Sequence, residues 1–338
     1  MRGLTSTQRQ LIIDFYDEWK PRISISAIEK DILVRDAILA IKDAGRREGC
    51  QLIFCGGTAL SQAHQFIERM SEDADFRVVV PDGLSNGQTR KLLSVVKEEI
   101  ATLLNDAGFP LVGEMRARNN NSYIMGEFSY QSRFSDGDPA IRDHLKLEVT
   151  AFAPISAVSE LQLATIIERV TSTTSINAAV PTISVMDTLA DKTVGYLRRS
   201  AQERAGLTRG NYDVRQVRHL YDMHCVFSRL EQLTDFDYCA FSGRLGELVG
   251  TVVERDLASY GNQFKEFAED AYGVLQDELT HLGDNEVRSR YERFCQSMIW
   301  GETPNFDEVV TTFGDLARSA LYGEPTITNE HDVALGVE

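Results

Sequence analysis

The segment Phe54–Val80, FCGGTALSQAHQFIERMSEDADFRVVV, combines a glycine turn and two aspartates within one short stretch of chain. The apolar residues at its start predict a strand that ends at Gly56 and Gly57, where backbone N–H groups can approach a phosphate closely. Asp73 and Asp75 stand two residues apart at the start of a second apolar run, and alternate side chains of a strand point to the same face. Because two such carboxylates repel each other unless a cation lies between them, the pair predicts a Mg²⁺ or Mn²⁺ site.

A third carboxylate stands in the strand-like segment HLKLEVTAF, residues 144–152. On a strand beside the aspartates, Glu148 is expected to complete the metal cluster or to act as the base that activates an attacking hydroxyl. Thr58 is expected to offer its hydroxyl to the phosphate and to cap the helix that follows the turn. The simpler interpretation is a solvated strand start and an exposed glutamate. The chain lacks the GxxxxGK[ST] and GxGxxG patterns of P-loop and dinucleotide-binding proteins.

The apolar spacing divides the chain into a mixed part and a helical part. Up to about Pro154 it predicts helices over residues 24–48, 58–69 and 85–108 and strands over 50–57, 75–80, 121–130 and 144–152. Beyond that point it predicts helices over 184–202, 212–233, 264–282 and 307–323. We therefore expect an α+β fold, with a mixed sheet flanked by helices in residues 1–155, a helical domain in 156–324 and a flexible tail in 325–338.

The formal net charge is −16, and it is unevenly spread. Residues 241–338 hold 7 basic and 19 acidic residues, a balance of 7 − 19 = −12 that does not attract nucleic acid. Residues 192–218 hold 7 basic and 2 acidic residues, 7 − 2 = +5, which predicts either a phosphate-binding surface or a solvated helix face. No apolar run reaches the roughly 20 residues that span a bilayer, and the N-terminus is too charged for a signal peptide. We therefore expect a cytoplasmic protein that does not bind membranes.

Several of these motifs resemble those of a known family. GGTAL at residues 56–60, followed by RMSEDADF at 69–76, is similar to the GG[ST]…[DE]xD signature of the nucleotidyltransferase superfamily with the DNA polymerase β-like fold. EKD at 29–31, LADKTVGYLRR at 189–199 and RHLYDM at 218–223 further resemble the AbiEii/AbiGii toxin family. The resemblance covers roughly residues 25–230.

The resemblance implies a metal-dependent nucleotidyltransferase that acts as the toxin of a bacterial toxin–antitoxin or phage-defence pair, with a cognate antitoxin as partner. It implies an NTP substrate, Mg²⁺ and an acceptor such as tRNA. It also implies Lys192 near the triphosphate and Asp222 on the same helical wall. The residues alone leave open an exposed lysine and an ion pair between Asp222 and Arg218. If the acceptor is tRNA, its phosphates are expected to contact three arginines: Arg198, Arg199 and Arg209.

Two other functions stay open at this point. One is a nucleotidyltransferase that modifies a small molecule such as an antibiotic, which would need an acidic acceptor pocket. The other is a regulatory module that retains the motifs and binds nucleotide without turnover. The nucleotide, the acceptor and the oligomeric state are not specified by the sequence.

Overall fold

The computed structural model describes residues 1–134, 138–174, 178–207 and 214–323. The chain forms two compact units. The sheet unit comprises Met1–Thr188 and Arg293–Thr303, and the helical unit comprises Leu189–Glu292 and the chain from Pro304 onward. The expected boundary at residue 155 therefore lies inside the sheet unit. The expected tail, residues 325–338, lies outside the described residues.

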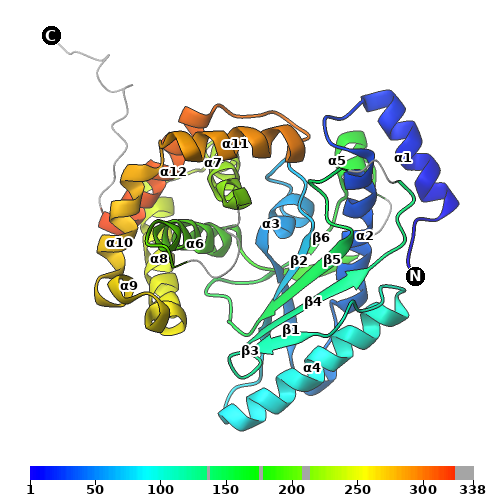
Figure 1. The fold of residues 1–338 in the computed structure, drawn as a ribbon, viewed down its shortest axis with the longest axis horizontal. Coiled ribbons are helices and arrows are strands. Elements are labelled where there is room, and N and C mark those ends of the chain that lie inside the picture. The colour runs from blue at the N-terminus through cyan, green and yellow to red at the C-terminus, as the bar shows by residue number, and fades with distance from the viewer. Residues whose placement is uncertain (135–137, 175–177, 208–213, 324–338) are drawn as a thin grey trace. The chain divides into compact units, whose positions relative to one another are not determined.

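The sheet unit is built on seven strands in the order β3-β4-β5-β2-β1-β7-β6 (Figure 1). The strands are β1 Gln51–Cys55, β2 Asp73–Val79, β3 Arg116–Arg118, β4 Tyr123–Ser129, β5 His144–Thr150, β6 Ser159–Gln162 and β7 Ala179–Thr182. The pairs β2–β5 and β1–β7 are parallel, whereas β1–β2, β3–β4, β4–β5 and β6–β7 are antiparallel. This mixed sheet confirms the expected α+β class. The unit continues past residue 155 because β7 pairs with β1.

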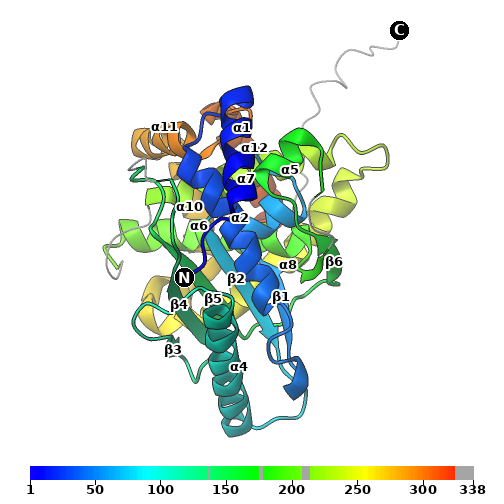
Figure 2. The same ribbon diagram turned by 90° about the vertical axis from the view of Figure 1, so that its right-hand side faces the viewer.

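Helices α2 and α4 cover one face of the sheet (Figures 1 and 2). The helices of this unit include α1 Ser6–Trp19, α2 Ile25–Ile41, α4 Asn86–Asp106 and α5 Ile166–Thr171. Ser24 caps α2 by accepting from the N–H of Ala27 at 3.3 Å, as its place before an apolar-periodic run predicts. Ala74 and Phe76 on β2 are buried, and they alternate with the two partly exposed aspartates of the same strand.

The segment after the glycine turn is not the long helix expected over residues 58–69. It forms a short helix, α3 Gly56–Thr58, and a wide turn, η2 Ala59–Ala63, and Gln65 then adopts a positive φ of 59°. Further on, the N–H of Met70 donates to the carbonyl of Met298 at 2.7 Å, and the N–H of Trp300 donates to the carbonyl of Glu68 at 3.0 Å. The backbone leaves the helix because these groups pair with a distant segment of the same unit.

The helical unit confirms the helical character expected of the second half. Its helices are α6 Val185–Arg204, which begins in the sheet unit, α7 Arg218–Leu230, α8 Tyr238–Tyr260, α9 Lys265–Glu269, α10 Ala271–Glu278, α11 Asn285–Met298, which ends in the sheet unit, and α12 Phe306–Tyr322. Within the unit, α12 packs against α7 and α8. No helix in the described part of the chain is both long and apolar enough to cross a membrane.

Candidate active site

The glycine turn fits closely against β2. Gly56 has a φ of +77°, and a Cβ at this position would lie 2.3 Å from Asp75 Oδ2. A Cβ at Gly57 would lie 2.4 Å from Arg69 Nη2. No other residue type fits at Gly56, since both the left-handed backbone and the contact exclude a side chain. The turn therefore brings its backbone to the edge of the Asp75 carboxylate.

Thr58 holds the turn to the aspartate strand. Its side chain is fully buried, and its Oγ1 lies 2.5 Å from the carbonyl oxygen of Asp73, to which it donates. Thr58 Oγ1 also lies 2.9 Å from Ser71 Oγ. This hydroxyl was expected to contact a phosphate, but in the structure it donates to the backbone of β2. Thr58 instead fixes the distance between the glycines and the paired carboxylates.

Neighbouring strands bring the three predicted carboxylates to one face of the sheet, which we call the carboxylate face. In the parallel β2–β5 ladder, Asp73 stands opposite Lys146 and Asp75 stands opposite Glu148. Directly paired residues of a ladder point to the same side. On the other side of β2, Cys55 at the end of β1 stands opposite Asp75. The structure thus brings Asp73, Asp75 and Glu148 together on one surface, as their spacing predicts.

Glu148 has partners on its own face. Its carboxylate forms an ion pair with Lys146, and both side chains are 27% exposed. It also accepts a hydrogen bond from the hydroxyl of Tyr123, whose pKa is raised by burial and by the charge of Glu148. Among the described residues, no group of three or more His, Cys, Asp and Glu is arranged to hold a metal ion. The role of Glu148 as a third metal ligand beside the two aspartates therefore stays a prediction.

A buried ionic network behind Asp73 was not predicted. Lys30, with a fully buried side chain, lies 2.8 Å from Glu72 Oε2, and its ammonium also donates to the carbonyl of Arg142 at 2.7 Å. Arg142 in turn lies 3.2 Å from Glu72 and 2.6 Å from Asp73 Oδ1. Burial alone would raise the pKa of Glu72, but Lys30 and Arg142 outweigh it and lower the value. Glu72 therefore stays ionised and fixes both cations.

Sequence reasoning missed Arg142 and Lys146 for different reasons. Arg142 stands in a polar loop between two strands, and nothing in the local pattern links it to a carboxylate 69 residues away. Lys146 could have been found, because it stands two residues before Glu148 in the same strand and so shares its face.

In the helical unit, Lys192 and Asp222 form a buried ion pair. Lys192 Nζ lies 2.6 Å from Asp222 Oδ2, and the side chains are 7% and 0% exposed. His219 packs beside them with Nδ1 3.3 Å from the carbonyl oxygen of Lys192. Burial, followed by the charge of Lys192, lowers the pKa of His219 well below its usual value. Lys192 on α6 and Asp222 on α7 therefore act as a pair, and neither is a solvated surface charge.

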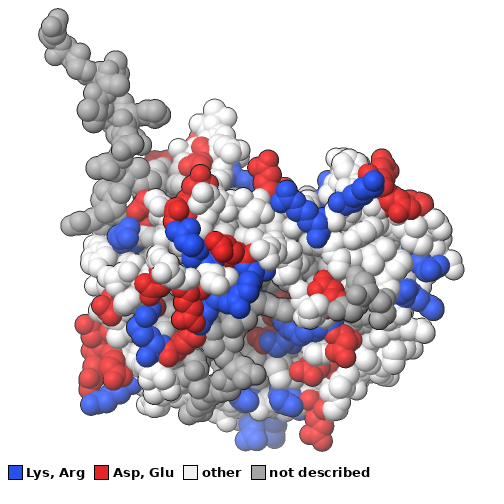
Figure 3. Space-filling model, turned by 45° about the horizontal axis from the view of Figure 1, so that its top comes forward, with Lys and Arg blue, Asp and Glu red and all other residues white. Residues whose placement is uncertain are grey.

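Three basic residues of the segment 192–218 form ion pairs with acids from elsewhere in the helical unit: Lys192 with Asp222, Arg198 with Asp256 and Arg204 with Glu278. Arg198 is buried, lies 2.8 Å from Asp256 Oδ2 and stacks 3.9 Å from the centre of the Tyr260 ring. The RNA contact expected of Arg198 is corrected on this ground, because its guanidinium is inside the unit. Arg199 is exposed, and Arg209 lies outside the described residues. On the face drawn in Figure 3, basic and acidic side chains are interspersed.

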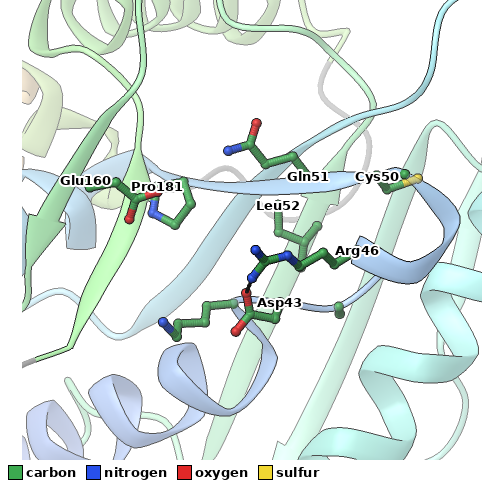
Figure 4. Close-up of a pocket in the computed structure, with 10 residues that line it drawn as sticks. Asp43, Arg46, Cys50, Gln51, Leu52, Glu160 and Pro181 are labelled. Atoms are coloured by element: carbon green, nitrogen blue, oxygen red, sulfur yellow. Dashed lines mark hydrogen bonds and ion pairs between the residues drawn. The ribbon is translucent and has the colours of Figure 1, made fainter.

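Two cavities are lined by residues other than the paired aspartates. One, of about 400 Å³, opens at the start of β1, with Arg46 turned toward Asp43 at 3.1 Å, and is also lined by the buried Cys50 (Figure 4). It contains none of the predicted site residues. The other, of about 230 Å³, lies in the helical unit and is lined by four acids and two arginines: Glu203, Glu278, Asp284, Glu286, Arg204 and Arg290. Both arginines are ion-paired with lining acids.

Comparison with known proteins gives a family match over most of the chain. A family model described as the nucleotidyl transferase AbiEii toxin of a type IV TA system matches residues 40–312. No curated protein matches the chain significantly. Among solved structures, the chain is similar to MenT4, a nucleotidyltransferase toxin from Mycobacterium tuberculosis H37Rv, with a TM-score of 0.45 and 15% identity over 95% of this chain and 99% of that chain. The family match includes the glycine turn, the paired aspartates and the Lys192–Asp222 pair.

Proposed function

The chain belongs to the AbiEii family of nucleotidyltransferase toxins and is therefore a nucleotidyltransferase, and from this premise we propose that it transfers a nucleotide from an NTP to an acceptor such as tRNA with the help of Mg²⁺ or Mn²⁺. The observation that supports this most strongly is the contact between the glycine turn and Asp75 on a strand that also presents Asp73 to the same face. Phosphate-approaching backbone and paired carboxylates are the parts that nucleotidyl transfer needs at one place.

The donor set of the carboxylate face fits such a cation. Mg²⁺ is usually held by one or two carboxylates together with substrate phosphates, and Asp73 and Asp75 provide two carboxylates on one face. A bound cation would supply charge neutralisation to the triphosphate and would overcome the repulsion between the aspartates. Glu148 is proposed as an additional ligand or as the group that orients the acceptor.

The other steps of the reaction are assigned to individual residues of the site. The N–H groups at Gly56 and Gly57 are proposed to bind phosphate oxygens, with Thr58 holding the turn in place. If Glu148 orients the acceptor, its carboxylate is proposed to accept the proton of the acceptor hydroxyl, whose oxygen forms a bond to the α-phosphorus while the bond to pyrophosphate breaks. Lys192 keeps its proposed role in triphosphate use, with Asp222 holding its ammonium.

A nucleic-acid acceptor is supported by exposed cations on the carboxylate face. Arg116 and Arg118 are exposed on the edge strand β3. Arg116 stands opposite Met125 on β4, which stands opposite Glu148 on β5, so Arg116 lies on the carboxylate face. Their charges lie near the site in a protein whose net charge is −16, so they are the groups to which an RNA backbone would be attracted. Arg199 on α6 is a further exposed candidate.

The proposal is tested by transfer of labelled nucleotide, from each of the four NTPs, to bulk tRNA. Asp73→Asn with Asp75→Asn should abolish transfer, whereas Asp82→Asn, at an exposed position after β2, should not change it. Loss of both arginines in Arg116→Gln/Arg118→Gln should reduce the salt dependence of tRNA binding by roughly 1.5–2 units of slope. Arg199→Gln is tested separately.

The alternative functions predict other outcomes. A small-molecule acceptor predicts no labelled tRNA and little salt dependence, and the acid-lined cavity of the helical unit is the observation that favours it. An inactive binding module predicts no pyrophosphate release with any NTP. A normal transfer rate in the double aspartate variant would reject the metal site.

The biological setting forms part of the same proposal. The family description names the toxin of a type IV toxin–antitoxin system, which supports a cognate antitoxin as functional partner. We place the protein in the cytoplasm, where NTPs and tRNA are available, and in phage defence. Growth arrest on expression, relieved by a neighbouring reading frame, is the expected result.

A further inference from the structure

The guanidinium of Arg142 occupies a position where a cation would be expected. Its Nη1 lies 2.6 Å from Asp73 Oδ1, and the Asp73 side chain is only 13% exposed. Asp73 is one of the two carboxylates proposed to hold the divalent cation. A guanidinium and a metal ion both seek the same lone pairs of a carboxylate.

The buried network of Lys30 and Glu72 fixes the backbone of Arg142. Its backbone N–H donates to Glu72 Oε2 at 3.0 Å, and its carbonyl accepts from the ammonium of Lys30 at 2.7 Å. Its Nε lies 3.2 Å from Glu72 Oε1. Because both backbone groups are held by a buried ion pair, the residue cannot drift away from Asp73. The side chain, which is 29% exposed, can still move its outer end.

Two cations cannot share Asp73 without repulsion. A divalent ion on Oδ1 would stand next to the guanidinium, and like charges at contact distance are strongly unfavourable in a partly buried site. An ion that takes Oδ1 would therefore displace the guanidinium from that oxygen. A triphosphate that arrives with the ion carries several negative charges, and arginine matches phosphate oxygens with paired donors.

We propose that Arg142 is a placeholder cation, which neutralises Asp73 while the site is without substrate and passes to an anionic oxygen of the triphosphate when a divalent cation takes Asp73. This inference rests on the proposed function. It predicts that Arg142 weakens binding of the metal alone and strengthens binding of the metal with triphosphate. The residue would thereby make metal binding depend on substrate.

The experiment measures Mn²⁺ binding directly, from the spin-resonance signal of free Mn²⁺, without nucleotide and then with inorganic tripolyphosphate. Arg142→Gln should bind Mn²⁺ alone roughly ten- to a hundredfold more tightly than the unaltered protein, because Mn²⁺ no longer has to displace the charge-assisted contact between Arg142 and Asp73. It should bind Mn²⁺–tripolyphosphate at least about tenfold more weakly. Arg142→Lys keeps the charge but not the paired donors, so it should bind Mn²⁺ alone like the unaltered protein and Mn²⁺–tripolyphosphate more weakly. Arg90→Gln, at an exposed position on α4, should change neither affinity.

The outcomes separate the inference from the proposed function. Unchanged or weaker binding of Mn²⁺ alone by Arg142→Gln, with an intact thermal unfolding transition, overturns the placeholder role. If that variant does not fold, Arg142→Lys takes its place. Unchanged affinity for Mn²⁺ alone with weaker binding of Mn²⁺–tripolyphosphate supports the role, whereas tighter binding of Mn²⁺ alone, or unchanged binding of both probes, overturns it. Mn²⁺ binding that survives Asp73→Asn with Asp75→Asn would instead reject the proposed metal site itself.

Discussion

The Lys192–Asp222 pair allows stability and activity to be separated in one set of variants. Lys192→Met removes the ammonium and leaves the Asp222 carboxylate, which is 0% exposed, without its 2.6 Å partner. Removing one partner of a buried ion pair costs about 3–5 kcal/mol, because the other charge stays buried without compensation. We therefore expect Lys192→Met to lower the free energy of unfolding by this amount, and its loss of nucleotide transfer alone would not identify a catalytic role.

The double variant resolves this ambiguity. Lys192→Met with Asp222→Asn removes both charges and keeps side chains of similar volume, and such replacements are often nearly neutral for stability. We expect it to recover most of the lost unfolding free energy while nucleotide transfer stays at the level of the single variant. Recovery of the fold without recovery of activity would show that the ammonium itself is needed.

The assay is urea unfolding followed by circular dichroism, together with pyrophosphate release at saturating Mg²⁺. Lys265→Met is the control in the same unit, because its ion pair with Glu269 is 82% and 66% exposed and should contribute only about 0.5 kcal/mol or less. If the free energy of unfolding of Lys192→Met lies within about 1 kcal/mol of that of the unaltered protein, the buried-pair reasoning is refuted. A double variant with normal turnover would refute the catalytic role.

Two further predictions concern the glycine turn and a buried acid. Gly83→Ala, at a φ of +78° with nothing within 4 Å, should cost only the about 1–2 kcal/mol of a left-handed alanine and no activity. Gly56→Ala should cost more stability than this and most of the activity, because its Cβ would also displace Asp75. Equal activity of the two variants would contradict this. Burial raises the pKa of Asp31 to about 6, so the stability that its protonated form contributes is present below pH 4 and is lost as the pH rises through 6. The unfolding free energy of the unaltered protein relative to Asp31→Asn should therefore fall by about 3 kcal/mol from pH 4 to pH 7, and a constant difference would disprove it.

Local pattern was sufficient where the determinants of structure are local. The glycine turn, the Asp73–Asp75 strand and the helix capped by Ser24 all follow from residue types within a few positions of one another. The strand that carries Glu148 was found from its alternation, and its burial alternates as expected. What alternation could not show is that this strand lies parallel to β2, with Glu148 opposite Asp75.

Longer-range pairing explains what was not predicted. The strands β6 and β7 have only four residues each, too few for alternation to identify them from the sequence. β7 takes its place in the sheet by pairing with β1, more than 100 residues earlier, and β6 pairs with β7. The helix expected to reach residue 69 ends early because the backbone of Glu68 and Met70 pairs with a segment near residue 300. In each case the pairing partner lies far away in the sequence, so a prediction from the local spacing of apolar residues cannot include it.

The same limit applies to charge, and it changes how the acceptor must be bound. A window charge of +5 describes a surface only if its members reach solvent, yet Lys192 and Arg198 are buried against Asp222 and Asp256. Contacts of an acceptor RNA with the three exposed arginines named above, Arg116, Arg118 and Arg199, correspond to a salt slope of only about −2 to −3. So weak a backbone attraction cannot by itself recruit RNA to a protein of net charge −16. If tRNA is the acceptor, its recognition must therefore depend on contacts to the bases and to the shape of the acceptor end, which would make transfer selective among RNAs of equal length.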